Sequence, residues 1–377
     1  MNSPGFAFTI LAFLLAIGPL IIVHELGHYL TGRLFGVKAD VFSIGFGREI
    51  AGWTDKRGTR WKVGWLPLGG YVKFKGDMNP ASTPSDEWLS MPAAERAETF
   101  QAQKLWQRFL IVAAGPVTNF LFAIIAFMII FSVVGYPTTP ADVGMVQPGS
   151  AAEEAGLRVG DQIVGVNGNR IATFAELQAY IVLRPEEEMI FDVRRGEQTV
   201  VLHARTHAEM REDEFRNRAR AGVLGIRPGG ALEFAPLPLS ELPGTAVKTT
   251  VGIVKSMVVA LGQVITGRRS FKELGGPLKI AEVSGQQASL GWLPFFWLMS
   301  VISINLGFIN LLPIPLLDGG HLLFYAIEGV RRKPLRPEAQ EWAFRTGLAV
   351  LLALMVFVTF NDLASFGLFS GLGRLIG

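Results

Sequence analysis

Cysteine is absent from the 377 residues of this chain. Its absence excludes disulfide bonds, zinc sites built on thiolates and catalysis by a thiol nucleophile. Any bound transition metal must therefore be held by histidine and carboxylate groups. The chain has only five histidines, so candidate ligands are few.

Charged side chains are scarce as well. They make up 18% of the residues, the net charge is +3, and no block of like charges stands out. Nucleic-acid-binding proteins concentrate Lys and Arg in one patch or segment, so no nucleic-acid partner is expected. Hydrophobic residues account for 50% of the chain, which is typical of an integral membrane protein rather than a soluble enzyme.

The apolar stretch at the N-terminus is interpreted as a retained transmembrane helix. It lacks the positively charged segment and the small-x-small cleavage site of a cleaved signal peptide. It continues directly into His24-Glu25-Leu26-Gly27-His28, so cleavage would remove the most informative motif of the chain.

Four stretches are long and apolar enough for a bilayer crossing, which needs about 20 residues. The sequence thus predicts a polytopic α-helical membrane protein with four transmembrane helices, near 6–34, 108–134, 293–312 and 346–360. The apolar segment 239–265 admits two interpretations, a fifth short span or an amphipathic helix on the membrane surface. Lys248, Lys255 and Gln263 interrupt this segment and favour the surface helix.

Lys and Arg gather in two of the connecting loops. By the positive-inside rule, the loop after the first span and the loop after the third span face the cytoplasm. The long region between the second and third spans, and both chain ends, are then expected outside. The basic residues are Arg33, Lys38, Arg48, Lys56, Arg57, Lys104, Arg108, Arg331, Arg332, Lys333 and Arg336.

The spacing of His24 and His28 places two imidazoles on one helix face, where both can reach one zinc ion. Glu25 lies beside the first imidazole and can take a proton from a water that zinc activates. The alternative is a chance match within a helix. We disfavour it because ionisable residues are costly inside an apolar segment and there mark functional sites.

A third ligand has to come from elsewhere, because no third histidine of the metzincin type follows His28. The other polar cluster in an apolar setting is the range 310–321, where Pro313-Ile314-Pro315 breaks a helix. Irregular backbone at membrane depth is tolerated where it is buried or lines a cavity. Asp318 is the predicted third ligand, with the fourth position left to water. His321 is the second choice, and a helix N-cap is the alternative role for Asp318.

These residues resemble a known family, the site-2 proteases of regulated intramembrane proteolysis, and within it the RseP-type proteases that regulate sigma-E. The resemblance covers nearly the whole chain and rests on the histidine motif and on the segment from Asn310 to Gly319. It implies that His24, His28 and Asp318 are zinc ligands and that Glu25 is the catalytic glutamate. The residues that it places near the substrate are Asn305, Asn310, Gly70, Tyr71 and Val72.

Three further segments resemble this family, namely Gly115-Pro116-x-x-Asn119 near the active site, a membrane-facing β-hairpin at 67–73 and the ending Phe360-Asn361-Asp362-Leu363. Period-two alternation between 60 and 75 also predicts strands. A substrate helix must unwind before its peptide bond can be attacked, and addition to a sheet edge would hold the extended chain. The alternative is a simple cytoplasmic cover over the zinc site.

The region after the second span resembles a PDZ domain of the bacterial protease type, on the residues 146–152 and 155–168. Thr173, with Glu176 three residues later, predicts a capped helix from 173 to 183. RseP-type members carry two PDZ units, whereas one is visible here. Binding of a peptide C-terminus, gating by bulk and a purely stabilising role all stay open. The segment 205–220 is interpreted as a mixed-charge linker.

The predicted organisation therefore alternates membrane segments with two polar regions. It consists of a first transmembrane helix (1–36), a cytoplasm-facing hairpin region (37–104), a second transmembrane helix (105–135), a PDZ domain (136–206), a linker with an amphipathic segment (207–290), a broken third transmembrane segment (291–333) and a fourth transmembrane helix with the C-terminus (334–377).

The resemblance implies an intramembrane zinc endopeptidase of the bacterial inner membrane, with its PDZ domain on the extracytoplasmic side. Its expected cofactor is Zn²⁺, and its expected partners are the lipid bilayer, single-pass membrane proteins such as anti-sigma factors and remnant signal peptides, and a peptide C-terminus. Two other classes are kept as alternatives, a proteolytically inactive PDZ scaffold and an intramembrane metal transporter.

Overall fold

The computed structural model describes residues 4–76, 88, 90–212, 218–231, 233–270 and 275–365. The chain forms two compact units, and helix α4 (Leu105–Val134) runs from one to the other. Unit 1 comprises residues 1–126 with 276–377, and unit 2 comprises residues 127–275. The predicted ranges 1–36, 37–104, 207–290 and 334–377 include positions outside the described residues.

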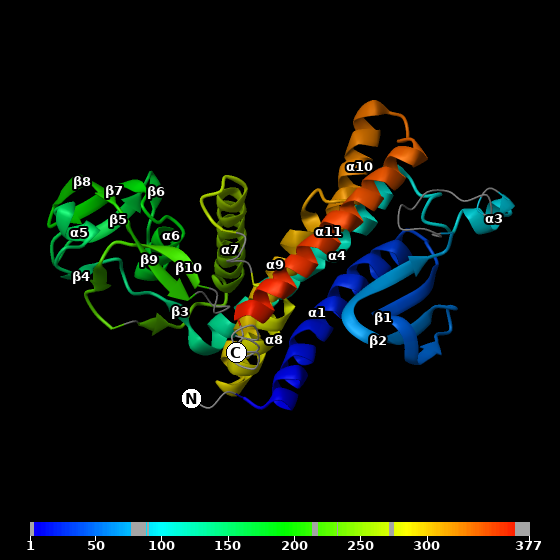
Figure 1. The fold of residues 1–377 in the computed structure, drawn as a ribbon, viewed down its shortest axis with the longest axis horizontal. Helices are drawn as coiled ribbons and strands as arrows, with labels where there is room; N and C mark the ends of the chain where they lie inside the picture. The colour runs from blue at the N-terminus through cyan, green and yellow to red at the C-terminus, as the bar shows by residue number, and fades with distance from the viewer. Residues whose placement is uncertain are drawn as a thin grey trace, which may run out of the picture. The chain divides into compact units, whose positions relative to one another are not determined.

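Unit 1 is mainly helical (Figure 1). Besides α4, its helices are α1 (Phe6–Leu34), α3 (Ala93–Arg96), α8 (Pro277–Ser289), α9 (Trp292–Leu311), α10 (Asp318–Arg331) and α11 (Pro337–Ser365). Its strands are β1 (Ala39–Thr54) and β2 (Arg60–Phe74).

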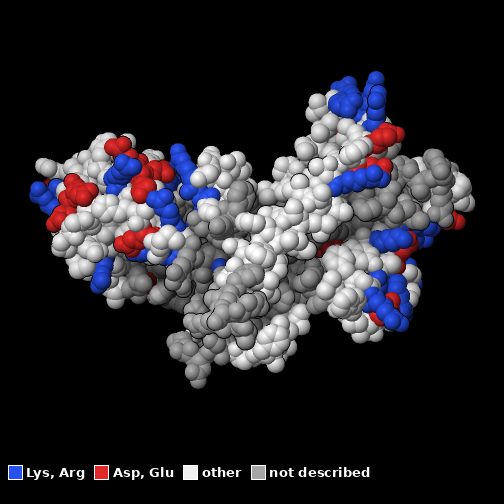
Figure 2. Space-filling model, viewed as in Figure 1, with Lys and Arg blue, Asp and Glu red and all other residues white. Residues whose placement is uncertain are grey.

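Within the described residues, five helices are long and apolar enough to cross a membrane, namely α1, α4, α7 (Leu242–Ile265), α9 and α11. The protein is therefore a polytopic membrane protein. Four of these helices coincide with the predicted spans, although α11 begins at Pro337 rather than near 346. In Figure 2 the helical surface of unit 1 is largely free of charge, while Lys and Arg gather at the α10–α11 turn and at the hairpin.

Helices α1 and α4 pack antiparallel. The Thr118 hydroxyl of α4 donates to the Val23 carbonyl of α1 over 3.0 Å. Further along α1, Nδ1 of His28 lies 2.9 Å from the Ile111 carbonyl of α4. Because the α4 partner moves toward the N-terminus as α1 proceeds, the two helices run in opposite directions.

Helix α9 is antiparallel to α4 in turn. The Ser303 hydroxyl donates to the Asn119 carbonyl over 2.9 Å, and the Phe122 and Phe296 rings meet at 6.2 Å between centroids. Helices α1 and α9 consequently run in the same direction. The chain after α9 therefore emerges at the end of the bundle where α1 carries its two histidines.

Strands β1 and β2 form an antiparallel sheet in which β2 folds back across β1. Val41 of β1 pairs with both Lys73 and Arg60 of β2, so residues 39–44 lie between the two halves of β2. Residues 60–64 pair with 49–54 on their other side. The segments 70–74 and 49–54 are therefore the two edges of this small sheet.

The end of α11 is joined to the start of α8 by one carboxylate. Asp362 is fully buried and accepts hydrogen bonds from the backbone amides of Gly276, Leu278 and Lys279. A carboxylate at a helix N-terminus satisfies amides that have no partner within the helix. Asp362 thus has a structural role: it holds the start of α8, and α8 packs along the first half of α1 at Gly285 and Thr9.

Unit 2 contains a four-stranded sheet and two short helices. The sheet has the order β6 (Asn169–Arg170), β5 (Gln162–Val166), β7 (Glu188–Arg195), β8 (Gln198–Arg205). Helices α5 (Ala151–Glu154) and α6 (Phe174–Val182) pack on its core, and Thr173 caps α6, as predicted. Arg195 binds Asp161 at 2.8 Å and holds the pKa of that buried carboxyl below its usual range.

Unit 2 extends beyond residue 206. The range 207–235, assigned from sequence to a linker, contains strands β9 (His207–Glu212), β10 (Arg218–Val223), β11 (Ile226–Pro228) and β12 (Phe234–Ala235). Strand β11 pairs with β4 (Val143–Val146), and β12 pairs with β3 (Tyr136–Pro137). The many charged residues of this segment made β9 and β10 hard to recognise as strands from sequence. Ala219 and Ala221 are buried while Arg220 between them is exposed, which is the alternation of a half-buried strand.

Helix α7 uses polar side chains to bind the sheet-containing part of unit 2, to which it also belongs. Lys248 donates to Glu176 of α6 over 2.6 Å, and the Gln263 amide donates to the Leu183 carbonyl. These are two of the three polar residues from which the sequence predicts a membrane-surface helix. The structure gives them a protein partner, so their polarity by itself does not establish contact with lipid headgroups.

Candidate metal centre

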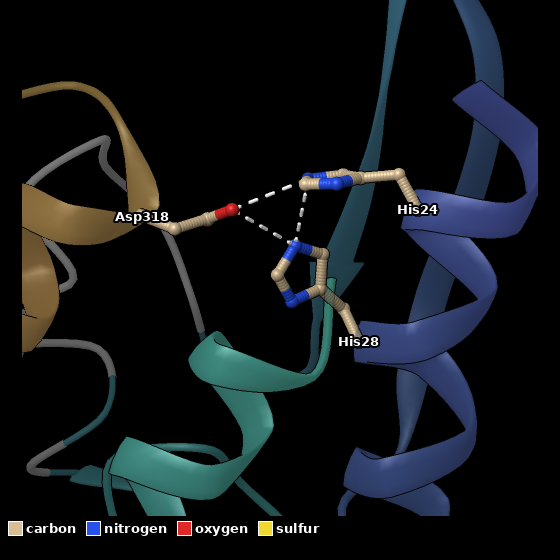
Figure 3. A group of neighbouring side chains, drawn as sticks. All are labelled: His24, His28 and Asp318. Atoms are coloured by element: carbon tan, nitrogen blue, oxygen red, sulfur yellow. Dashed lines mark hydrogen bonds and ion pairs between the residues drawn. The ribbon is translucent and has the colours of Figure 1, made fainter. Parts of the chain in front are cut away.

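The two histidines of α1 converge on one point. They lie one helical turn apart, and their Nε2 atoms are 3.2 Å from each other. Nδ1 of His28 is engaged by the Ile111 carbonyl, and Nδ1 of His24 lies 3.1 Å from the side-chain amide of Asn119. Both imidazoles therefore turn their Nε2 atoms toward the same space (Figure 3).

A carboxylate from the start of α10 completes this cluster. Oδ2 of Asp318 lies 3.2 Å from Nε2 of His24 and 3.5 Å from Nε2 of His28 (Figure 3). The N-cap residue of α10 is Leu317, so Asp318 is not in the capping position. The side chain of Asp318 faces the two histidines instead. Sequence left both roles open for Asp318, and its orientation favours ligation.

The loop before Asp318 is tightly folded. Helix α9 ends at Leu311 and the chain resumes helix at Asp318, with Leu316 at a φ of +82°. Positive φ is strained for a leucine, and strained backbone is typical of functional sites. Side chains at Gly319 or Gly320 would collide with the carbonyls of the loop, so the Gly-Gly pair lets the loop fold over the first turn of α10.

The donor set fits a metal ion. Oδ2 of Asp318 is buried and has no hydrogen bond of acceptable geometry, although both histidine nitrogens lie near it. Three ligand atoms from His24, His28 and Asp318 lie within 4.8 Å of one another. Two imidazole nitrogens and one carboxylate oxygen are a usual zinc set, and three protein ligands leave a position open for water or substrate.

Gly115 of α4 provides the space in which the imidazoles lie. A Cβ at this position would overlap the His28 ring and would lie 2.9 Å from Cε1 of His24. Helix α4 can therefore approach α1 closely only with glycine at this point. This contact gives the Gly115-Pro116 motif a physical role beside the histidines.

Comparison with known proteins also points to a metallopeptidase. The model of Peptidase family M50 matches residues 12–354. Metalloprotease MmpA of Caulobacter vibrioides is 38% identical over 396 residues, covering 98% of this chain and 99% of MmpA. Proteins of Agrobacterium fabrum and Rhizobium meliloti, each provisionally named a zinc metalloprotease, are 42% and 41% identical, with 94% of this chain and 96% of each relative covered.

The chain belongs to peptidase family M50. This is the site-2 protease family that the sequence resembles, and its members depend on zinc. The protein is accordingly a zinc-dependent metallopeptidase.

In this M50 peptidase, the side chain of Glu25 projects from α1 toward the sheet edge that contains Gly70. It is buried, and the edge segment approaches so closely that a Cβ on Gly70 would lie 2.8 Å from Cγ of Glu25. The backbone of Val72 also lies close to the Glu25 carboxylate. Tyr71, between them, stacks on Phe46 with 6.1 Å between centroids. The three hairpin residues named from sequence thus lie beside the histidine motif.

The remaining candidates of the M50 peptidase lie outside the ligand cluster. Asn305 and Asn310 are half-buried on α9, and His321 is not a member of the cluster of possible His and carboxylate ligands found in the described residues. His321, the second choice for third ligand, packs its ring against Phe344 at 5.0 Å between centroids.

The contacts of α4 with the two imidazoles were not predicted. Asn119 was noted only as part of a motif, and Ile111 acts through its carbonyl, which carries no sequence signal. Pro116 offers a retrospective clue, because a proline removes an amide from the helix and loosens the hydrogen bonds of the preceding turn. The carbonyl that loses its helical partner is that of Val112, next to Ile111.

Proposed function

We propose that this metallopeptidase is an intramembrane endopeptidase that cleaves single-pass membrane proteins within or near their spanning helix. The observation that carries the proposal is the union of His24 and His28 from one apolar helix with Asp318 from the chain after another. A site assembled from two spans is positioned to act on a substrate inside the bilayer. By resemblance, the substrates are anti-sigma factors and remnant signal peptides.

The residues of the site have distinct roles in this proposal. His24, His28 and Asp318 hold the zinc ion, which when bound supplies Lewis acidity to activate water and polarise a carbonyl. Glu25 accepts a proton from the attacking water and delivers it to the departing amine. Asn310 assists substrate placement. The decisive measurement is whether the purified protein cuts a transmembrane substrate inside its span, and whether that cut requires Glu25.

The proposed arrangement has four spans, with α7 at the outer surface of the bacterial inner membrane. Helices α4 and α9 are antiparallel, so Val134 and Trp292 lie on one side of any bilayer that both helices cross. The intervening chain must therefore cross an even number of times. Helix α7 is its one candidate span among the described residues, and α8, with 13 residues, is only about 20 Å long. Because the number of crossings is even and α7 is the one candidate span, we propose that the chain between α4 and α9 does not cross the membrane.

This topology predicts the labelling of single cysteines. Because the natural chain has none, Ser240→Cys and Arg268→Cys each carry one thiol, at opposite ends of α7. Both are expected to react with a membrane-impermeant maleimide added to intact spheroplasts. Lys333→Cys in the α10–α11 loop is the control, and it should react only after lysis. Labelling of positions 240 and 268 from opposite sides would show that α7 spans.

We further propose that unit 2 contains a PDZ-type domain on the extracytoplasmic side. Its four-stranded antiparallel sheet, the short helices α5 and α6 and a single core support the assignment. Strand β11 pairs with β4 in a second, two-stranded sheet of the same unit. A domain of this type would receive a peptide C-terminus by strand addition at an unpaired edge. Such a C-terminus would be left when a first protease removes the outer part of a substrate.

The sheet edge at 70–74 is proposed to hold the unwound substrate. This segment is at an edge of the hairpin sheet and lies against Glu25. Residues paired across antiparallel strands have Cβ atoms about 5 Å apart, within reach of a disulfide, and every second residue faces the same side. An added substrate strand would therefore present alternate residues to Lys73.

Disulfide trapping can test this docking mode. Lys73→Cys in an inactive Glu25→Gln background, oxidised with dipyridyl disulfide, should link to substrate cysteines at positions spaced by two. Trp53→Cys, on the opposite edge, is the matched control and should give no links. Links spaced by three to four residues would indicate a helical substrate. Equal linking at position 53 would refute docking at the 70–74 edge.

A further inference from the structure

Asn119 lies beside the metal centre, in the packed middle of unit 1. It is fully buried on α4, and Ser303 of α9 donates to its carbonyl over 2.9 Å. Its side-chain amide lies 3.1 Å from Nδ1 of His24, on the ring edge away from Asp318. Asn119 therefore touches a ligand residue and no reacting group.

The other histidine shows what such a contact accomplishes. A carbonyl oxygen only accepts hydrogen bonds, so Nδ1 of His28 must carry a proton that it donates to Ile111 over 2.9 Å. In a neutral imidazole this leaves the lone pair on Nε2, which faces the cluster. His28 is thereby fixed in the state that a metal ligand needs.

His24 needs an acceptor at Nδ1 to be fixed in the same state. In the described part of the chain, the Asn119 amide is the group that meets this nitrogen. Its Nδ2 end faces the ring, while its Oδ1 is buried without a hydrogen-bond partner. The two ends of an amide have nearly the same shape and exchange by a half-turn. After that turn, Oδ1 accepts a hydrogen bond from Nδ1–H of His24, and Nε2 presents its lone pair to the cluster.

We infer that Asn119 is a positioning residue, which accepts a hydrogen bond from His24 and so orients Nε2 toward zinc. The inference rests on the proposed ligand set. It assigns α4 one function for both histidines, because Ile111 and Asn119, two turns apart, supply the two acceptors. Partners of this kind typically change metal affinity by about 10–100-fold when removed.

The test compares zinc affinity in variants that keep or remove an acceptor. Wild type, Asn119→Leu and Asn119→Asp are purified in one detergent, and zinc binding is measured by chelator competition. A leucine has no acceptor and should weaken binding by about 10–100-fold. An aspartate accepts but cannot donate, so it should bind within about threefold of wild type or more tightly.

The control is Thr118→Val, one residue away on the same helix. It removes the hydrogen bond to the Val23 carbonyl without touching an imidazole, so it should lower the thermal stability and leave zinc affinity unchanged. Wild-type affinity in the leucine variant would overturn the inference. So would an aspartate variant that binds more than about tenfold more weakly, and this comparison holds even if the leucine variant fails to fold. A wild type that binds no stoichiometric zinc would instead refute the ligand set.

Discussion

Replacing Asp318 by alanine is expected to remove zinc from the purified protein and to abolish proteolysis. The substitution deletes the one carboxylate of the proposed ligand set and leaves two imidazoles, which alone form an incomplete zinc site. Loss of an indirect partner costs about 10–100-fold in metal affinity, so loss of a direct ligand should cost at least about 10³-fold. Zinc content by elemental analysis and cleavage of a transmembrane substrate are measured on the same preparation.

A matched control lies one turn along the same helix. His321→Ala removes the other candidate ligand, whose ring packs on Phe344, and it should retain stoichiometric zinc. Asp318→Glu keeps a carboxylate at a greater reach and should recover part of the zinc that alanine loses. Full zinc and activity in Asp318→Ala, or loss of zinc in His321→Ala alone, would show that the third ligand has been assigned to the wrong residue.

Replacing Glu25 by glutamine should separate metal binding from catalysis. The two side chains have nearly the same shape, and Glu25 is not a member of the ligand cluster, so zinc should stay bound at wild-type stoichiometry. An amide cannot accept the proton of the attacking water, and loss of a general base typically costs about 10²–10⁴-fold in rate. Product formation per unit time, normalised to zinc content, measures this effect.

The same variant distinguishes the other functional classes. A PDZ scaffold would keep its biological role without Glu25, and its wild type would not cut a transmembrane substrate. A metal transporter would move zinc into proteoliposomes. That transport would not depend on proteolytic activity. Wild-type cleavage in Glu25→Gln would contradict the proposed general base, because no other carboxylate of the described chain lies in the histidine motif.

The residues of the candidate metal centre could be proposed from sequence because burying ionisable groups costs free energy. His24, Glu25, His28 and Asp318 are ionisable groups in apolar surroundings, and such groups are retained only where they function. Two of them share a helix face, which local periodicity reveals directly. Asp318 could be proposed because Pro313-Ile314-Pro315 marks a break in an apolar helix, where irregular backbone must be buried or line a cavity.

The course of unit 2 was less predictable. The ribbon of β9 and β10 lies within a dense run of charges, and its alternation rests on small residues such as Ala219 and Ala221. Polar residues of α7 were expected at a membrane surface, yet Lys248 binds α6 and Gln263 binds the residue that caps its C-terminal end. A polar side chain on an apolar helix signals a polar neighbour, but the sequence does not say whether that neighbour is water, lipid or protein.

By itself, the sequence determined the chemical class of this protein. The absence of cysteine, the apolar spans, the His24–His28 spacing and the distant Asp318 define a membrane metallopeptidase from local patterns. The tertiary structure decided which atoms meet. It brought Asp318 to the histidines, placed Gly70 against Glu25, and set Asn119 and Ile111 behind the two imidazoles. These contacts join residues some 45 to 294 positions apart, as the numbering shows. They depend on the directions in which α1, α4 and α9 pack, and helix packing direction leaves no mark in local sequence periodicity.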